Sequence, residues 1–186
     1  MNPTSNKNDF EDLTTNLKDL AYSYLEKYNP SKQQLKVYLL KKYLTKIKGS
    51  KSKNEVSTII NEVIENLEKN RIINDKLYSD SKARMFLRRG YSLNKIHQSL
   101  RHKGIDSKYI KQSIDKIKED QIEPDFVSAL KLCKRRRIGP LRPQANRELF
   151  YKKDMGILAR GGFNFDLSKR VLNLDVEEFN KLLKIV

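Results

Sequence analysis

The sequence predicts an all-α protein, organised as an elongated array of about three tandem three-helix repeats. Apolar residues recur at helical spacing along most of the chain, no stretch shows the alternation of a convincing strand, and parts of the sequence recur at fixed offsets. Hydrophobic residues make up 38% of the 186 residues, which is too few for one large globule. Several small cores, each completed by a neighbouring repeat, fit this composition better.

The first helices are bounded by clear signals. Residues 1–8 show no periodicity and are predicted to form a disordered tail. The helix that follows should end at Pro30, and Ser31 with Gln34 forms a capping box that begins the next helix. Residues 46–54 form a basic loop, which could be a hinge, a contact or a solvated linker. After it comes the clearest amphipathic stripe, made of Val56, Ile59, Ile60, Val63, Ile64 and Leu67.

Further helices are predicted to begin near Ser79, Ser92 and Asp106. Another begins at Pro124, because proline suits the first helical turn. The last two helical stretches are residues 164–172 and 175–185.

Internal repetition divides the chain. Leu67, Ile72 and Asp75 recur 50 positions later as Ile117, Ile122 and Asp125. A second correspondence, at a different offset, joins residues 88–91 (RRGY) to residues 160–163 (RGGF). We therefore expect a first repeat over residues 9–72, a second over 73–121 and a third over 122–186.

The charge balance indicates a polyanionic partner. The chain has 39 basic and 23 acidic residues, a net charge of +16, which attracts nucleic acid and resists self-association. A generally basic, lysine-rich proteome would give the same surplus. We expect a monomer in a reducing cytoplasm, because Cys133 is the single cysteine and no apolar stretch approaches the length of a membrane span. No cofactor is expected.

Several segments, in this order, resemble the RecX family of recombinase modulators. Residues 67–75 (LEKNRIIND) with Tyr78 are similar to the entry into the family's central repeat, and residues 88–92 (RRGYS) begin that repeat's core pattern. Residues 132–140 (LCKRRRIGP) and 161–172 (GGFNFDLSKRVL) resemble the start and the closing helix of its third repeat. The resemblance covers about residues 56–172.

This resemblance implies a function in homologous recombination, DNA repair and the SOS response. A family member would bind the RecA recombinase filament on single-stranded DNA and limit its extension, ATP hydrolysis and strand exchange. It would contact the DNA through the filament or directly. No membrane partner is implied.

The first candidate binding group is the basic end of the helix that begins at Pro124. Lys134, Arg135, Arg136 and Arg137 spread around the helix and cannot all be buried, and the basic run continues to Arg142 and Arg160. We interpret these side chains as contacts to phosphates or to acidic residues of a partner. Cations at a helix C-terminus also offset the helix dipole, which is the alternative interpretation.

The second candidate group lies around the central repeat and comprises Arg88, Arg89, Arg101 and Lys103. Tyr91 and Tyr109 are interleaved with it. Tyrosines at this spacing are more often core residues, although they could stack on bases. Gly90, Gly104 and Gly162 are predicted to end helices with a positive φ.

The sequence offers no catalytic constellation. His97 and His102 are five residues apart, the wrong spacing for a metal-binding helix face. Asp75 and Asp125 are explained by helix capping and Cys133 by core packing. We therefore predict that the chain is not an enzyme.

Two alternatives to recombinase regulation stay open. The chain could be a helical nucleic-acid-binding module, of helix-turn-helix type over residues 79–117 or RNA-associated, or a basic structural protein without a specific partner.

Overall fold

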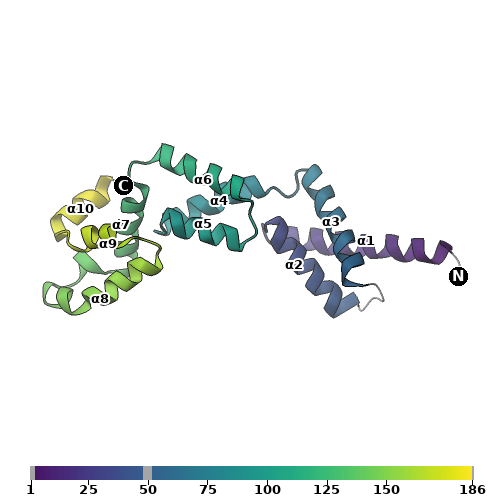
Figure 1. The fold of residues 1–186 in the computed structure, drawn as a ribbon, viewed down its shortest axis with the longest axis horizontal. Helices are drawn as coiled ribbons and strands as arrows, with labels where there is room; N and C mark the ends of the chain where they lie inside the picture. The colour runs from purple at the N-terminus through teal and green to yellow at the C-terminus, as the bar shows by residue number, and fades with distance from the viewer. Residues whose placement is uncertain (1–2, 48–51, 186) are drawn as a thin grey trace. The chain divides into compact units, whose positions relative to one another are not determined.

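The computed structural model describes residues 3–47 and 52–185, and within these ranges every regular element is helical (Figure 1). The predicted all-α class is confirmed. The chain divides into two compact units, which are described separately. The first comprises Met1–Tyr78 with Lys103–Asp106, and the second comprises Ser79–His102 with Ser107–Val186. The division into three repeats stays a prediction.

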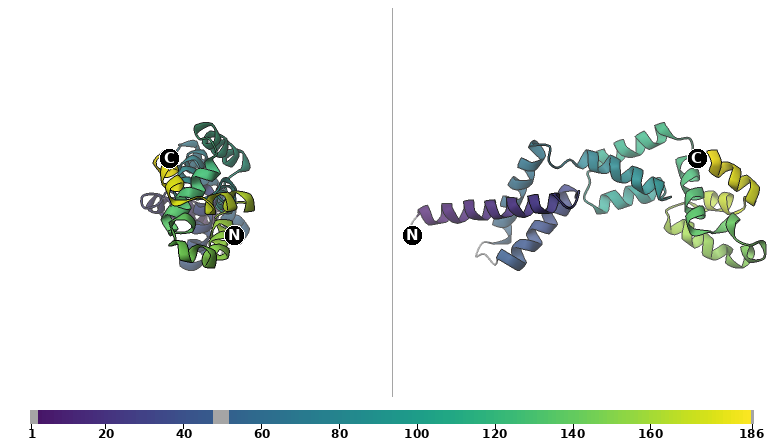
Figure 2. Two further views of the ribbon diagram at one scale, coloured as in Figure 1. Left: turned by 90° about the vertical axis from the view of Figure 1, so that its left-hand side faces the viewer. Right: turned by 180° about the vertical axis from the view of Figure 1, so that it is seen from behind.

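The first unit is a bundle of three helices. Its elements are α1 (Pro3–Leu25), α2 (Lys32–Lys42), the π-helical turn η1 (Tyr43–Ile47) and α3 (Lys53–Lys69). The core between them consists of one stripe from each helix, including Leu17, Leu35 and Ile60, all fully buried. The N-terminal end of α1 extends past α2 and α3 in Figure 1 and in the right-hand view of Figure 2.

The start of α2 follows the predicted capping signal, whereas α1 ends at Leu25, before the predicted end at Pro30. Ser31 accepts a hydrogen bond from the backbone of Gln34, whose side chain accepts one from the backbone of Ser31, so the predicted capping box is present. α1 is described from Pro3, within the range predicted as a tail. Within the predicted basic loop, residues 48–51 lie outside the described residues, and α3 begins directly after its N-cap Ser52.

The second unit contains the remaining helices. They are α4 (Asp75–Arg88, which begins in the first unit), α5 (Leu93–His102), α6 (Ser107–Asp120), α7 (Pro124–Arg136), the short 3-10 helix η2 (Gly139–Leu141), α8 (Gln144–Arg160), α9 (Phe165–Leu172) and α10 (Val176–Ile185). α7, α8, α9 and α10 surround one core, to which Leu130, Leu158 and Phe179 contribute fully buried side chains.

Sequence periodicity did not reveal α8. The helix spans 17 residues, yet only Asp154 and Leu158 are buried. Its other apolar residues are distributed around the helix instead of forming one stripe. The 3.6-residue period that marks an amphipathic helix is therefore absent from this segment.

Two carboxylates that were predicted to be helix caps bond the start of a neighbouring helix. Asp75 Oδ1 accepts the backbone N–H of Lys32, the first residue of α2, at 2.9 Å. Asp125 Oδ1 accepts that of Leu93, the first residue of α5, at 2.7 Å. The capping chemistry was predicted correctly, and packing between helices determines which helix is capped. The recurrence of this contact in both units supports the proposal of repeats.

Candidate nucleic-acid interface

The C-terminal end of α7 displays four consecutive cations. Lys134, Arg135, Arg136 and Arg137 are all exposed, while the opposite face of the helix is buried around Cys133. Arg137 has φ 53° and ψ 51°, the left-handed conformation that glycine usually occupies at this position. Within residues 3–47 and 52–185, no carboxylate forms an ion pair with any of the four. These charges are available to a partner.

Two of these arginines line a basic cleft. Arg135 and Arg136 of α7 meet Arg160, the last residue of α8, and Lys95 in the first turn of α5, around a space of about 360 Å³. Tyr91 lines the same cleft, together with Leu132, Ile157 and Gly161. None of the lining residues is acidic. Guanidinium and ammonium groups around one concavity make an anion-binding site, because the fork of N–H donors in arginine matches the oxygens of a phosphate.

Close backbone approaches hold the walls of the cleft together. Gly90 has φ +72°, and a Cβ built there would lie 2.7 Å from the backbone nitrogen of Leu132 on α7. Gly162 has φ +89°, and its Cβ would lie 2.3 Å from Ser92 Oγ. The backbone N–H of Ser92 donates to the carbonyl of Gly161 at 3.2 Å. Glycine is required at both turns, and the predicted positive φ is confirmed at Gly90, Gly104 and Gly162.

A second hollow adjoins the basic cleft and shares Lys95 and Arg160 with it. Its volume is about 510 Å³, and polar side chains of Asn94, Gln98 and Asn164 line it. Amide side chains both donate and accept hydrogen bonds. Together the two hollows place a basic wall next to a surface whose amide side chains can donate and accept hydrogen bonds.

The remaining predicted binding residues lie outside this cleft. Arg88 and Arg89 are exposed at the end of α4, and Arg101 is exposed in the last turn of α5, whereas Lys95 lies in the first. Lys103 is half-buried in the first unit, where its carbonyl accepts a hydrogen bond from Ser31 Oγ at 2.6 Å. Their assignment to partner binding stays a prediction.

Arg142 is bound within the protein. Its guanidinium donates to both carboxylate oxygens of Asp154, at 2.6 and 2.7 Å, and lies 4.5 Å from the ring centre of Phe150. Asp154 Oδ2 also accepts the backbone N–H of Gly139. The hydrogen bonds to Asp154 hold the pKa of Arg142 above its usual range. The assignment of Arg142 to binding another molecule stays a prediction, although its guanidinium is already paired with Asp154.

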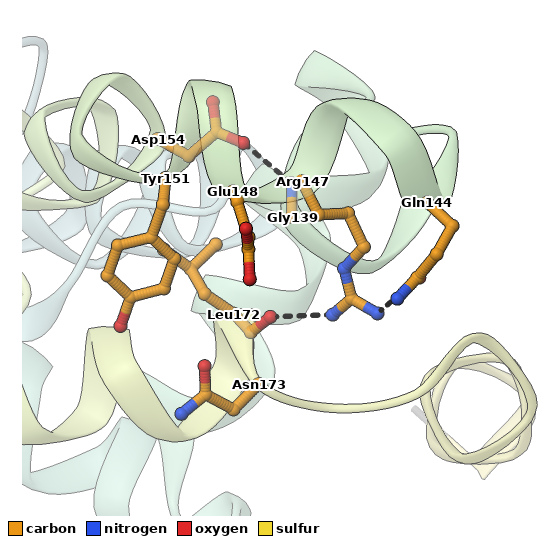
Figure 3. Close-up of a pocket in the computed structure, with 8 residues that line it drawn as sticks. All are labelled: Gly139, Gln144, Arg147, Glu148, Tyr151, Asp154, Leu172 and Asn173. Carbon is orange, nitrogen blue, oxygen red and sulfur yellow. Dashed lines mark hydrogen bonds between the residues drawn. The ribbon is translucent and has the colours of Figure 1, made fainter.

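The pocket drawn in Figure 3 also contains an arginine that forms hydrogen bonds within the protein. It encloses about 500 Å³ between η2, α8 and the end of α9. Arg147 donates to the carbonyls of Leu172 and Leu174, at 2.8 and 2.7 Å, and so caps the C-terminal end of α9. The cation in this pocket therefore has a structural role.

Tyr91 and Cys133 have the surroundings of packing residues. Tyr91 is half-buried, and its ring stacks on Phe86 with the ring centres 5.3 Å apart. Cys133 is fully buried, and burial, together with the nearby Asp154 carboxylate, raises the pKa of its thiol to about 12. Within the part of the chain that the structure describes, no three His, Cys, Asp or Glu side chains gather closely enough to hold a metal ion. The same residues contain no helix long and apolar enough to cross a membrane.

Lys95 is the cleft residue that sequence reasoning missed. It lies outside every basic run and immediately follows Asn94 on a short, otherwise mixed helix. Its place in the cleft comes from the packing of α5 against the loop that ends α8, which no local pattern encodes.

Both the sequence and the fold of this chain are similar to those of regulatory proteins named RecX. No protein-family model matches the chain. The regulatory protein RecX of Myxococcus xanthus (strain DK1622) is 30% identical over 161 residues, which cover 86% of this chain and 85% of that protein. The crystal structure of RecX from Lactobacillus salivarius has a TM-score of 0.60 at 18% identity and covers 95% of this chain and 99% of its own. A crystal structure of a regulatory protein RecX gives a TM-score of 0.60 at 20% identity, covering 89% of this chain and 74% of its own.

Proposed function

The chain belongs to the RecX family of regulatory proteins, and from this premise we propose that it binds RecA-type recombinase filaments on single-stranded DNA. Binding limits filament extension and thereby lowers ATP hydrolysis and strand exchange. The basic cleft of Lys95, Arg135, Arg136 and Arg160 is the observation that carries this proposal. It supports contact with the DNA backbone inside a nucleoprotein surface.

The cleft suits a phosphate backbone because four cations surround it and no acidic residue lines it. If each cation neutralises one phosphate of a single strand, log Kobs should fall with log salt by about 0.7 for each contact, or about 2.8 in total. Such contacts position a protein on DNA without selecting a sequence. A regulator that acts on filaments formed on DNA of any sequence needs this kind of binding.

Regulation follows from binding a growing polymer. A protein that occupies the filament surface at an end blocks addition of the next recombinase subunit, while ordinary disassembly continues. The net result is shortening, and few bound molecules suffice. This end-blocking mechanism predicts a substoichiometric effect. The proposal is non-enzymatic, and the buried Cys133, with a thiol pKa of about 12, is unsuited to act as a nucleophile.

The experiment adds the protein, well below stoichiometry, to a recombinase filament on single-stranded DNA and follows ATP hydrolysis over time. We expect a progressive decline that weakens in the triple variant R135A/R136A/R160A. The control variant K111A/K118A/K181A removes the same charge from exposed positions outside the cleft and should behave as the wild type. A strict one-to-one titration would contradict end blocking. Unchanged hydrolysis with tight binding to a naked duplex or RNA would instead support a plain nucleic-acid-binding module.

A further inference from the structure

An apolar groove lies between α8 and α9. It encloses about 520 Å³, and Met155, Ala159, Phe163 and Phe165 contribute to a lining that is almost entirely apolar. The side chain of Phe165, the first residue of α9, is 64% exposed at its edge. An aromatic side chain left in water beside an apolar hollow is unfavourable in the free protein, and such patches mark interaction sites.

Gly156 lies in the interior of α8 and lines the same groove. Glycine is less favourable than alanine at such a position, because it loses more backbone entropy when the helix forms. Among residues 3–47 and 52–185, a Cβ built at Gly156 would meet only the Arg160 guanidinium, at 3.4 Å, so close packing does not require glycine there. Gly90, in contrast, would place its Cβ 2.7 Å from backbone. Gly156 therefore contributes only backbone to the lining of the groove, at the expense of helix stability.

The charge around the groove indicates the chemistry of its occupant. Lys152 is the charged residue among those that line it. Ala159 and Phe163 line both the groove and the hollow that contains Lys95 and Arg160, so apolar and basic surfaces are continuous. A second copy of this chain is a poor occupant, because its net charge of +16 would be repelled. A DNA backbone is equally unsuited to an apolar lining.

We infer that the groove between α8 and α9 docks an acidic segment of the recombinase, which inserts a large apolar side chain over Gly156 while its carboxylates face Lys152. This inference rests on the proposed function and deepens it. The basic cleft holds the DNA, and the adjoining groove holds the protein of the same filament. Linked contacts of two kinds raise the affinity for the nucleoprotein above that for either component alone.

The test uses Gly156→Leu, which fills the groove, and Phe165→Ser, which removes its exposed edge and cannot open a cavity in the core. Gln112→Leu adds the same leucine to an exposed position on α6 and is the matched control. Each full-length variant is titrated against recombinase filaments on single-stranded DNA and against the naked strand. We expect both groove variants to bind filaments at least about tenfold more weakly, the loss typical of a removed anchor contact. Binding of Phe165→Ser to the naked strand should not change. Binding of Gln112→Leu to filaments and to the naked strand should not change either.

A further variant separates docking from folding. Gly156→Ala should raise the thermal midpoint of unfolding, because it improves the helix, and yet weaken filament binding. A wild-type protein that fails to bind filaments would overturn the proposed function together with this inference. A wild type that binds, with groove variants that bind equally well, would overturn the groove inference alone. An equal loss of naked-strand binding in Phe165→Ser would assign the groove to nucleic acid and overturn the inference as well. Loss of self-association in the groove variants would assign the groove to a second copy, with the same consequence.

Discussion

Replacing Asp154 by alanine should destabilise the C-terminal helices by about 3–5 kcal/mol. The carboxylate is 2% exposed and accepts hydrogen bonds from Arg142 Nε, Arg142 Nη2 and the backbone of Gly139. It thereby connects α8 to the loop that follows α7. Alanine removes the acceptor for all three donors.

The magnitude follows from these contacts. Two hydrogen bonds to a charged group contribute about 1.5–3 kcal/mol each, and leaving the buried N–H of Gly139 unsatisfied costs about 1–3 kcal/mol. The sum is an upper limit, because the side chain of Arg142 is 19% exposed and water reaches part of it. We therefore expect a value typical of a broken buried pair, about 3–5 kcal/mol out of a total of about 5–15 for a domain.

The assay is urea unfolding at neutral pH, followed by far-ultraviolet circular dichroism. Asp120→Ala, which removes an exposed carboxylate at the end of α6, should change the free energy of unfolding by less than about 0.5 kcal/mol. The double variant R142A/D154A should lose less than the sum of the two single variants, because each single change leaves a charge without its partner. A loss below about 1 kcal/mol for Asp154→Ala would refute this reasoning.

Three further predictions concern backbone conformation and pH. Gly90→Ala should lower the free energy of unfolding by at least about 1–3 kcal/mol, measured by urea unfolding, because a Cβ in the left-handed conformation there also meets the backbone of α7. Arg137→Gly should instead raise the free energy of unfolding by up to about 1 kcal/mol, because glycine adopts the left-handed conformation at the end of α7 without strain. The same variant should weaken filament binding. A lower free energy of unfolding would contradict the left-handed geometry. Burial of Asp80 opposes its ionisation, but hydrogen bonds from Lys116 and Ser113 outweigh it and hold its pKa below 3.8. Its contribution to stability is therefore present above pH 3.8 and lost as pH falls through the lowered value, so the stability difference from Asp80→Asn should shrink in strong acid, and a constant difference in a pH series would disprove the linkage.

The sequence predicted those helices whose burial is one-sided. In α3, Val56, Ile59, Ile60 and Val63 fall on one face and are all buried, so the period of the pattern equals that of the helix. In α8 the apolar residues point in several directions, and Asp154 is buried by its ion pair with Arg142, not by hydrophobicity. A pattern search finds apolar stripes and misses a helix whose packing depends on a buried carboxylate and on apolar residues spread around its surface.

The candidate site was predictable where charge is consecutive along the chain. Arg135 and Arg136 belong to a run of four cations, which a helix must expose. Arg142, although part of the same basic region, forms an internal ion pair, because Asp154 lies opposite it in the fold. Lys95 joins the cleft through tertiary packing alone. Composition therefore predicted a polyanionic partner, and only the fold distinguishes available cations from those already paired.

The most direct test of the central claim is the length of recombinase filaments on single-stranded DNA, followed over time by fluorescence of individual filaments. Substoichiometric wild-type protein should shorten the filaments. R135A/R136A/R160A should shorten them much less, and the charge-matched K111A/K118A/K181A should act as the wild type. Equal shortening by all three proteins would contradict a role for the basic cleft, and growth unaffected by the wild type would contradict filament regulation itself.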